Sequence, residues 1–389
     1  MKKIVAFLLF STLVCTLQAQ IKVGAERTEA YFPILQNKKV VVCGNQTSMV
    51  GNTHLVDTLV KSGIQVTAIF CPEHGFRGEA EAGATIHSSV DSKTGIPIVS
   101  LYGSNKKPKI TPGSMDIILF DLQDVGCRFY TYISTLHYVM EAAAENGVKV
   151  IILDRPNPNG YFVDGPVLED SYKSFVGMHP IPIVHGMTIG EYGKMINGEH
   201  WLNGGIHCDL QTITMEGYDH SMRYSLPIAP SPNLQTDEAI YLYPSLCLFE
   251  GTPISIGRGT ATPFEIYGHP NLTEGEFYFT PQSIKGISEN PPQEGVKCRG
   301  VNLTQTARNN LSKSNQFSIT YLLEAYRHFP NKPSFFNSNN FFNKLAGNES
   351  LKQQIISGKN EAEIRKSWEP ALHHFKEIRK QYLLYKDFE

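Results

Sequence analysis

The residues from 115 to 160 predict a strand, a helix and a second strand in direct succession. They read "MDIILFDLQDVG" (115–126), "YISTLHYVMEAAAENG" (132–147) and "VKVIILDRPNPNG" (148–160). The two outer segments contain continuous apolar runs, which are typical of strands covered on both faces. The middle segment is rich in good helix formers, and Gly147 is expected to end it. This order predicts parallel strands joined by a right-handed crossover.

The same alternation continues on both sides of this unit. Apolar runs and helical periodicity predict a strand, a helix and two more strands at 38–48, 52–63, 64–75 and 95–103. A further strand-to-helix step is expected at 181–199, where Thr188 caps the helix and Glu191 completes a capping box. We therefore predict an α/β domain built on a parallel sheet.

The second half of the chain differs in composition and in the spacing of its apolar residues. Residues 221–270 are dense in proline and glycine, which predicts mostly loop structure. Apolar stripes at helical spacing return in 317–329 and 361–385. The predicted organisation is an α/β domain at 20–215, a loop-rich segment lining a cleft at 216–270 and a smaller α+β domain at 271–389.

The first 19 residues have the pattern of an export signal. Two lysines precede an apolar run at 4–17, which is shorter than the about 20 residues of a membrane-spanning helix. Ala19 is a small residue at which the leader can be cleaved, so we expect a periplasmic or extracellular protein. Lipid attachment at Cys15 is the alternative, but a valine stands before it where a small residue is wanted.

Composition excludes several classes of partner and cofactor. The chain has 35 Lys and Arg residues against 37 Asp and Glu, a formal charge of -2, and no long basic run, so we expect no nucleic-acid partner. The six cysteines outside the leader match no zinc spacing, and we expect mostly free, buried thiols. No complete dinucleotide or phosphate-binding motif occurs, so no cofactor is expected.

Nearly every predicted strand is followed by polar or charged residues. Ligands bind beyond the carboxyl ends of the strands in open parallel sheets, so these side chains are candidates for one binding rim. They are Asn45, Gln46, Glu73, His74, Arg77, Tyr102, Asp121, Gln123, Asp124, Arg128, Asp154, Arg155, Asn157 and His185. Capping of the next helix is the competing explanation for any single member. The number of such groups at one edge favours a binding site.

The segment "AIFCPEHGFRGEA" (68–80) contains the sharpest candidate. Glu73 follows an apolar strand, and Gly75 and Gly78 permit a tight turn or the close approach of a ligand. A carboxylic acid at the rim of an apolar floor is suited to donate a proton. The competing explanation is a salt bridge between Glu73 and Arg77 within the loop.

A second group of candidates lies in "FDLQDVGCRFYTY" (120–132). Asp121 and Asp124 are three residues apart, and Arg128 and Tyr130 follow. Two carboxylates suit a divalent cation, or they act as a catalytic acid and an acceptor for sugar hydroxyls. Capping of the following helix is the structural alternative.

A third group lies in "EGTPISIGRGTATPFEIYG" (250–268). Arg258 stands between two glycines, which suits a guanidinium that binds a carboxylate through two hydrogen bonds. Glu250 and Glu265 flank it.

These motifs together resemble a known family. In chain order they are "PEHGFRGEAEAG" (72–83), "SLYG" (100–103), "FDLQDVGCRFYTYISTL" (120–136), "LDRPNPNG" (153–160), "FVGMHPIPIVHGMTIGE" (175–191), "APSPNLQT" (229–236) and "EGTPISIGRGTATPFEIYG" (250–268). They resemble the NamZ-like exo-β-N-acetylmuramidases, a family long known only as a domain of unknown function, and the resemblance extends over nearly the whole chain after the leader.

The resemblance implies a glycoside hydrolase that removes terminal N-acetylmuramic acid (MurNAc) from the non-reducing end of peptidoglycan fragments, such as MurNAc–GlcNAc disaccharides and muropeptides. It also implies a Rossmann-like domain, a smaller C-terminal domain and an active site in the cleft between them. Glycosidases normally use two carboxyl groups. Glu73 is the leading one, and its partner stays open among Asp121, Asp124, Glu250 and Glu265.

The same chemistry suggests the substrate contacts. Muramic acid carries a lactyl ether with a carboxylate, which an arginine should recognise, and Arg258 and Arg128 are the candidates. Tyrosines are suited to form sugar platforms, and histidines to bind the N-acetyl group or to adjust the acid. The full expected substrate-binding set is His74, Arg77, Tyr102, Arg128, Tyr130, Asn157, His185, Asn233, Glu250 and Arg258.

Two other functions are compatible with the residues. One is an exported protein that captures muropeptides without turnover. The other is a metal-dependent hydrolase that uses Asp121, Asp124 and His74, whereas the preferred interpretation needs no metal.

Overall fold

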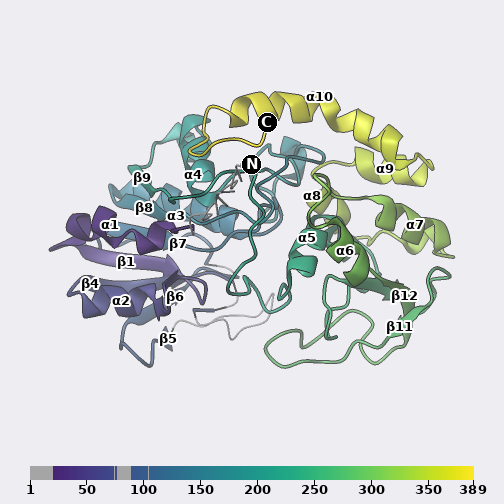
Figure 1. The fold of residues 1–389 in the computed structure, drawn as a ribbon, viewed down its shortest axis with the longest axis horizontal. Coiled ribbons are helices and arrows are strands. Elements are labelled where there is room, and N and C mark those ends of the chain that lie inside the picture. The colour runs from purple at the N-terminus through teal and green to yellow at the C-terminus, as the bar shows by residue number, and fades with distance from the viewer. Residues whose placement is uncertain (1–20, 74, 77–88, 104) are drawn as a thin grey trace, which may run out of the picture.

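The computed structural model describes residues 21–73, 75–76, 89–103 and 105–389 (Figure 1). The predicted leader at 1–19, His74 and Arg77 therefore lie outside the described residues. Among the described residues, no helix is both long and apolar enough to cross a membrane.

A seven-stranded sheet forms the centre of the N-terminal half. Its spatial order is β5-β6-β4-β1-β7-β8-β9, and all neighbours are parallel except β5, which runs antiparallel to β6. The strands are β1 (Lys39–Gly44), β4 (Gln65–Cys71), β5 (Ser89–Val90), β6 (Pro97–Ser100), β7 (Ile117–Asp121), β8 (Lys149–Leu153) and β9 (Leu210–Ile213). A short hairpin of β2 (Met49–Val50) and β3 (Thr53–His54) lies beside it. The predicted parallel α/β sheet is confirmed.

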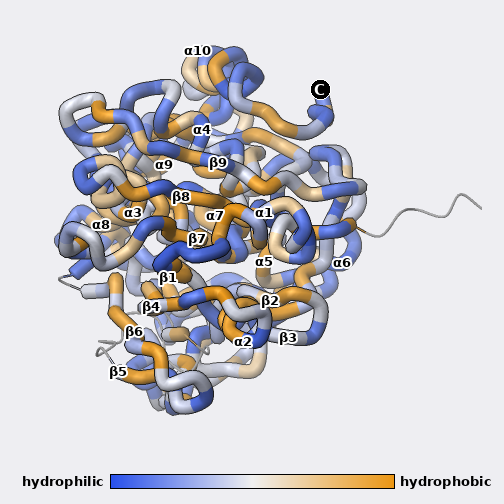
Figure 2. The backbone as a smooth tube through the Cα atoms, turned by 90° about the vertical axis from the view of Figure 1, so that its left-hand side faces the viewer, coloured by the Kyte–Doolittle hydropathy of each residue, from blue (hydrophilic) through white to orange (hydrophobic). Residues whose placement is uncertain are grey.

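Helices cover both faces of this sheet. Along β1, Val40 and Val42 belong to one hydrophobic core and Val41 and Cys43 to the other, as expected for a strand buried on both sides. The first core includes α1 (Thr28–Leu35) and α2 (Leu55–Lys61), and the second includes α3 (Tyr132–Asn146) and α4 (Ile189–Gly198). Figure 2 shows hydrophobic residues along strands of the sheet such as β4 and β8.

The predicted ends of two helices are confirmed. Gly147 follows α3 in the left-handed conformation, with a φ of 64°. Thr188 and Glu191 form the reciprocal hydrogen bonds of a capping box at the start of α4. The strand predicted before α4 is wrong, because Val184 makes only isolated bridges, to Cys127 and Asp164.

The C-terminal half combines a small sheet with helices. The sheet is antiparallel in the order β10-β12-β11, and its strands are β10 (Ile266–His269), β11 (Phe277–Phe279) and β12 (Cys298–Asn302). The helices are α5 (Asp237–Leu246), α6 (Thr304–Asn310), α7 (Thr320–His328), α8 (Phe341–Ala346), α9 (Ser350–Ile356) and α10 (Glu361–Arg379). The smaller C-terminal domain with its own sheet is confirmed, and α5 lies within the segment that was expected to be mostly loop.

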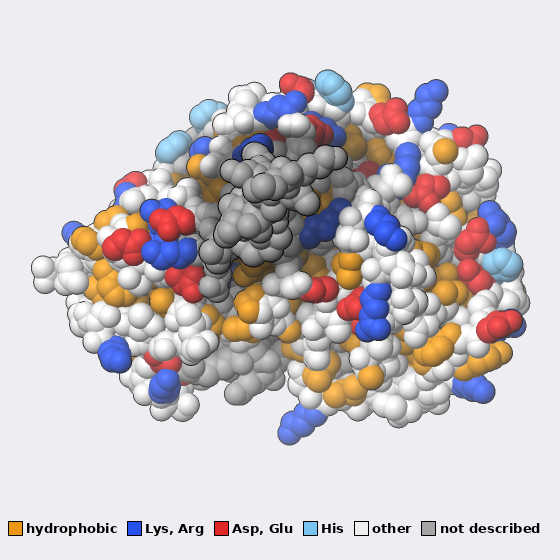
Figure 3. All heavy atoms as spheres, viewed as in Figure 1, with side chains coloured by type: hydrophobic (Ala, Val, Ile, Leu, Met, Phe, Trp, Pro, Cys, Tyr) orange, Lys and Arg blue, Asp and Glu red, His pale blue; other side chains and the backbone are white. Residues whose placement is uncertain are grey.

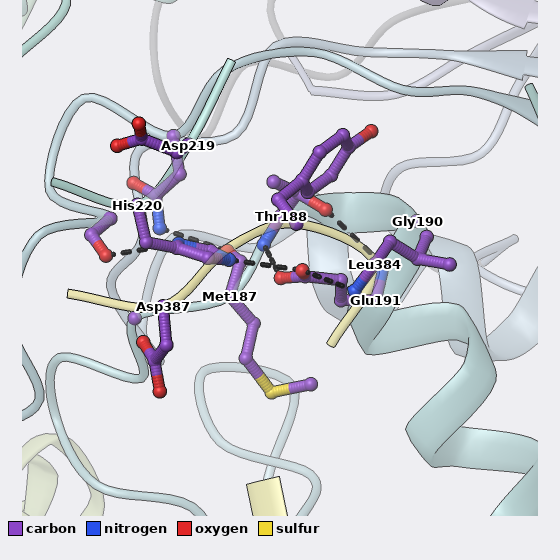
Figure 4. A network of polar contacts seen from close by, with 12 residues as sticks. Met187, Thr188, Gly190, Glu191, Asp219, His220, Leu384 and Asp387 are labelled. Carbon is purple, nitrogen blue, oxygen red and sulfur yellow. Dashed lines mark hydrogen bonds and ion pairs between the residues drawn. The ribbon is translucent and has the colours of Figure 1, made fainter. Parts of the chain in front are cut away.

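The residues after α10 turn back to the N-terminal half, and Leu384 among them contacts α4 (Figure 1). Glu191 holds this tail, because its Oε1 accepts hydrogen bonds from the Leu384 amide at 2.8 Å and from His220 at 2.9 Å (Figure 4). The Tyr385 hydroxyl also donates to Asp154 Oδ2 at 2.6 Å. The tail therefore ties the two halves together.

The cysteine prediction is confirmed for the described residues. Cys43, Cys71, Cys127, Cys208, Cys247 and Cys298 are all free and buried.

Candidate active site

A cavity of about 490 Å³ lies between the two halves of the chain. The face shown in Figure 3 is hollowed between these halves. The N-terminal half and the following loop contribute Glu73, Tyr102, Phe129, Tyr130, Thr131, Tyr132, Phe175, Val176, Ser231 and Leu234, and the C-terminal half contributes Tyr243, Glu250, Arg258, Phe264, Ile287, Ser288, Asn290 and Phe341.

Glu73 reaches the cavity from the loop after β4. Thr131, directly before α3, donates a hydrogen bond from Oγ1 to Glu73 Oε2 at 3.1 Å. Tyr102 follows the neighbouring strand β6, and burial together with the nearby Glu73 carboxylate raises the pKa of its phenol. Tyr102 is therefore a neutral hydroxyl at neutral pH. The predicted placement of Glu73 and Tyr102 at neighbouring strand ends agrees with the structure.

A group of aromatic rings forms an apolar wall. Tyr243 lies at its centre and makes edge contacts with Phe129, Tyr130 and Phe264 at ring-centroid distances of 5.3, 5.9 and 5.0 Å. The Tyr130 hydroxyl donates to the Pro230 carbonyl at 2.9 Å, and burial raises the pKa of Tyr130 well above its usual value. This wall offers apolar surface with fixed hydroxyls, which suits the face of a sugar ring.

An ion pair stands on the side of the C-terminal half. Arg258 Nε and Nη2 donate to Glu250 Oε1 at 3.0 and 2.6 Å, and the guanidinium lies 4.9 Å from the Phe264 ring centroid. Burial alone would lower the pKa of Arg258, but the Glu250 carboxylate outweighs burial and raises it. Arg258 therefore stays charged, and its charge is matched by Glu250.

The glycines beside Arg258 have a structural reason. Gly257 and Gly259 adopt φ values of 79° and 78°, which side chains other than glycine rarely adopt. A Cβ on Gly259 would also lie 2.4 Å from the Gln282 carbonyl oxygen. Two left-handed residues and a close backbone contact thus fix the position of Arg258.

The structure places Asp121 and Asp124 away from the cavity. Both oxygens of the fully buried Asp121 accept hydrogen bonds from Arg155, at 2.6 and 2.9 Å. Asp124 Oδ2 accepts from the Gly126 amide at 2.7 Å and lies 3.5 Å from His185 Nε2. Neither aspartate caps the following helix, because the N-cap of α3 is Thr131, so the expected capping is wrong. Asp121 is instead held by an ion pair and Asp124 by a turn, and His185 is also fully buried.

Arg128 is placed inside the protein and not at the cavity. Its guanidinium is fully buried and donates to three main-chain carbonyls, those of Pro166, Ile181 and Leu345, at 2.8, 2.7 and 2.8 Å. Burial lowers the pKa of Arg128 to about 9, so the group is charged at neutral pH. Arg128 connects three segments of backbone, and a substrate carboxylate has no access to it.

Three further expected site residues also have structural partners. Glu265 accepts hydrogen bonds from Thr236 and Thr304 at 2.6 and 2.7 Å, which join α5 to α6. Asn157 donates to the Met187 carbonyl at 2.8 Å. Asn233 donates to the Ile287 carbonyl at 2.8 Å and so holds a cavity-lining loop.

Several cavity residues were not predicted from the sequence. Thr131, Tyr132 and Tyr243 lie on or next to helices, where their spacing is that of core residues. The loop carrying Ile287, Ser288 and Asn290 has no motif that would have singled it out. The available signal was the aromatic content of the segments that surround the predicted acids.

Metal binding was the chemistry of one alternative. Among the residues that the structure describes, no group of three or more His, Cys, Asp or Glu side chains is arranged to hold a metal ion. Asp121, one of the proposed ligands, instead accepts hydrogen bonds from Arg155 at both carboxylate oxygens.

The fold and the cavity define a class of protein. A Rossmann-like domain and a smaller domain enclose a pocket with an aromatic wall, and each half supplies one glutamate, Glu73 and Glu250. Two carboxyl groups beside a sugar-sized apolar surface are typical of glycoside hydrolases.

Comparison with known proteins identifies the family. The model of the N-terminal domain of the exo-β-N-acetylmuramidase NamZ matches residues 40–238, and that of its C-terminal domain matches residues 241–385. The chain therefore belongs to the NamZ family. It is 39% identical over 379 residues to the peptidoglycan β-N-acetylmuramidase NamZ of Bacillus subtilis strain 168, with 90% of each chain covered.

Solved structures agree with this assignment. One DUF1343 family protein from Bacteroides fragilis NCTC 9343 matches with a TM-score of 0.87 and 48% identity, over 95% of this chain and 100% of the other. A second from the same organism matches with a TM-score of 0.79 and 29% identity, over 94% and 99% of the two chains.

Proposed function

We propose that the protein hydrolyses the β-glycosidic bond of a terminal N-acetylmuramic acid at the non-reducing end of peptidoglycan fragments. The observation that carries the proposal is the interdomain cavity, in which Glu73 and Glu250 come from the two halves of a NamZ-family chain. The cavity has room for one sugar with its substituents, which suits an enzyme that removes terminal residues.

The two glutamates have different surroundings and hence different proposed roles. Glu73 is held by a neutral hydroxyl, that of Thr131, and lies near the protonated phenol of Tyr102. We assign it as the acid that protonates the leaving glycosidic oxygen. Glu250 is matched by Arg258 and is the second carboxylate, which stabilises the positive charge that develops on the sugar. Water supplies the hydroxyl group of the released muramic acid. The remaining proton of this water replaces the one that Glu73 gave to the leaving oxygen.

The other predicted site residues differ in their position relative to the cavity. Tyr102 and Tyr130 line the cavity and are proposed sugar contacts. His74 and Arg77 neighbour Glu73 in the sequence and stay proposed contacts. Asp121, Asp124 and Glu265 are not part of the proposed catalytic pair, because none of them is among the residues that line the cavity and each is bound by structural partners.

The proposed location is the periplasm or the exterior of the cell, after cleavage of residues 1–19. This rests on the lysines, the apolar run and the small residue before the cleavage position. Peptidoglycan fragments are present on that side of the membrane. Mass spectrometry of the protein isolated from its native cells tests the proposal, since a chain that starts at Met1 would contradict it.

The test of function compares a chromogenic β-N-acetylmuraminide with the matching β-N-acetylglucosaminide. We expect the purified protein to hydrolyse the muraminide only, and Glu73→Gln to lose at least about 100-fold in kcat because the acid is removed. Glu369→Gln, an exposed glutamate on α10, is the matched control and should keep the full rate.

Two results would replace this proposal. Tight binding of N-acetylmuramic acid with no turnover of either sugar would indicate a capture protein. Turnover that is lost with EDTA and restored by a divalent cation would indicate a metal-dependent hydrolase.

A further inference from the structure

The charged residues described as lining the cavity do not provide a cation for the carboxylate of an acidic substrate. Among the described lining residues, the charged ones are Glu73, Glu250 and Arg258, and Glu250 matches the charge of Arg258. The remaining charged group is an acid, Glu73. The proposed substrate carries a lactyl carboxylate, so a cation without an acidic partner is needed near the cavity. This inference rests on the proposed function.

The arginines expected to read this carboxylate are both engaged. Arg128 is buried and binds three carbonyls. A second carboxylate at Arg258 would lie beside Glu250 and be repelled by it, since Glu250 already accepts from Nε and Nη2.

Among the residues that the structure describes, Lys106 is a cation that meets the requirement. Its Nζ lies 4.8 Å from the ring centroid of Phe175, and Phe175 lines the cavity. No acidic side chain of the described residues forms an ion pair with Lys106. The next residue, Lys107, differs in this respect, because Glu141 and Glu145 each bind its Nζ at 2.7 Å.

The platform beneath Lys106 is fixed in place. The Phe175 carbonyl accepts a hydrogen bond from Ser134 Oγ at 2.7 Å. The Phe175 ring stacks on the Tyr138 ring, with 6.3 Å between the two ring centroids. Ser174 and Gly177 close a tight turn around it through two main-chain hydrogen bonds of 2.9 and 3.0 Å. The aromatic face therefore holds the ammonium group beside a residue that lines the cavity, in a cation–π contact that leaves its N–H donors available.

We propose that Lys106, positioned over Phe175, binds the lactyl carboxylate of the substrate and thereby selects muraminides over uncharged hexosaminides. A lysine suits this role because its flexible side chain presents three donors to a single carboxylate.

The test uses paired substrates and paired variants. The substrates are the chromogenic β-N-acetylmuraminide and its lactyl methyl ester, which has the same shape without the charge. We expect Lys106→Met to lower kcat/KM for the acid about 10- to 100-fold, mainly through KM, since a charge-assisted hydrogen bond is removed. The ester should change less than about threefold, Lys106→Arg should keep most of the activity on the acid, and Lys107→Met should match the wild type on both substrates.

Three results would overturn the assignment. They are equal losses on acid and ester in Lys106→Met, no loss on either, and a wild type that uses the ester as well as the acid. Calorimetric binding of free N-acetylmuramic acid and of its methyl ester keeps the inference testable where turnover is absent. Weaker binding of the acid alone by Lys106→Met supports the role of Lys106 even if the proposed hydrolysis fails.

Discussion

The hydroxyl of Thr131 offers a direct test of how Glu73 is positioned. Thr131 Oγ1 donates to Glu73 Oε2 at 3.1 Å. Thr131 is the residue before α3, but its side chain makes no capping hydrogen bond to the helix. Valine has nearly the same shape as threonine and no hydroxyl. Thr131→Val therefore removes the bond to Glu73 and leaves the start of α3 without a new defect.

The size of the effect follows from the bond. An ordinary hydrogen bond contributes about 0.5–1.5 kcal/mol, and one to a charged group about 1.5–3 kcal/mol. Glu73 changes from a protonated acid to a carboxylate as it gives up its proton, and it is partly exposed, so a value of about 1.5 kcal/mol applies. We expect kcat/KM on the chromogenic muraminide to fall about 10-fold, which corresponds to about 1.4 kcal/mol of transition-state stabilisation. The loss should appear in kcat, because Thr131 acts on the orientation of the acid and not on binding of the sugar.

Thr131→Ser is the control that keeps the hydroxyl. Initial rates over a range of substrate concentrations separate kcat from KM, and thermal unfolding shows that all three proteins are folded. A serine variant as slow as the valine variant would refute the role of the hydroxyl. Wild-type kcat in Thr131→Val would show that Glu73 is positioned by other contacts.

Three further predictions concern residues outside the cavity. Arg128→Met leaves three buried carbonyls without their donor, so it should lower the free energy of unfolding, measured by urea denaturation, by about 3 kcal/mol or more. The control is Arg327→Met at an exposed position, which should change the free energy of unfolding by less than about 0.5 kcal/mol. Glu265→Gln should keep kcat within about threefold of wild type, and a loss as large as that of Glu73→Gln would return Glu265 to the catalytic pair. Burial raises the pKa of Asp154 to about 6 in the folded protein, above the about 3.9 of an unfolded carboxyl. The folded state therefore binds the extra proton, and Asp154 should lower the free energy of unfolding by up to about 3 kcal/mol as the pH rises from about 4 to above 6. Asp154→Asn should remove this component, and identical pH dependence in the two proteins would contradict the assignment.

The sequence predicted the sheet of the N-terminal half well because its signal is local. Strands buried on both faces require continuous apolar runs, so β1, β4, β6, β7 and β8 stand out. The elements that were missed lack such a signal. β9 reads Leu-Gln-Thr-Ile and carries two polar residues, and α5 contains Pro244 within a segment rich in proline and glycine.

The candidate site was harder to predict than the fold. A parallel sheet does place polar groups at one edge, but the sequence does not show which of them are already satisfied. Asp121 is bound by Arg155, which lies 34 positions later in the chain, and no local pattern reveals that pairing. Glu73 and Asp121 therefore look alike in the sequence, whereas only Glu73 lines the cavity.

The buried polar residues at the strand ends have a function of their own, because they set where the two halves lie. Glu73 and Glu250 can act on one sugar only if the halves keep a fixed relation. Arg128 fixes it by binding the Leu345 carbonyl in the C-terminal half, at 2.8 Å. Glu191 adds the contact with the returning tail at Leu384. Buried polar contacts of this kind are costly to break, since each leaves a desolvated group without a partner. A variant at such a position can therefore lose activity with every cavity residue intact. Its kcat has to be compared with its folded fraction before a catalytic role is assigned.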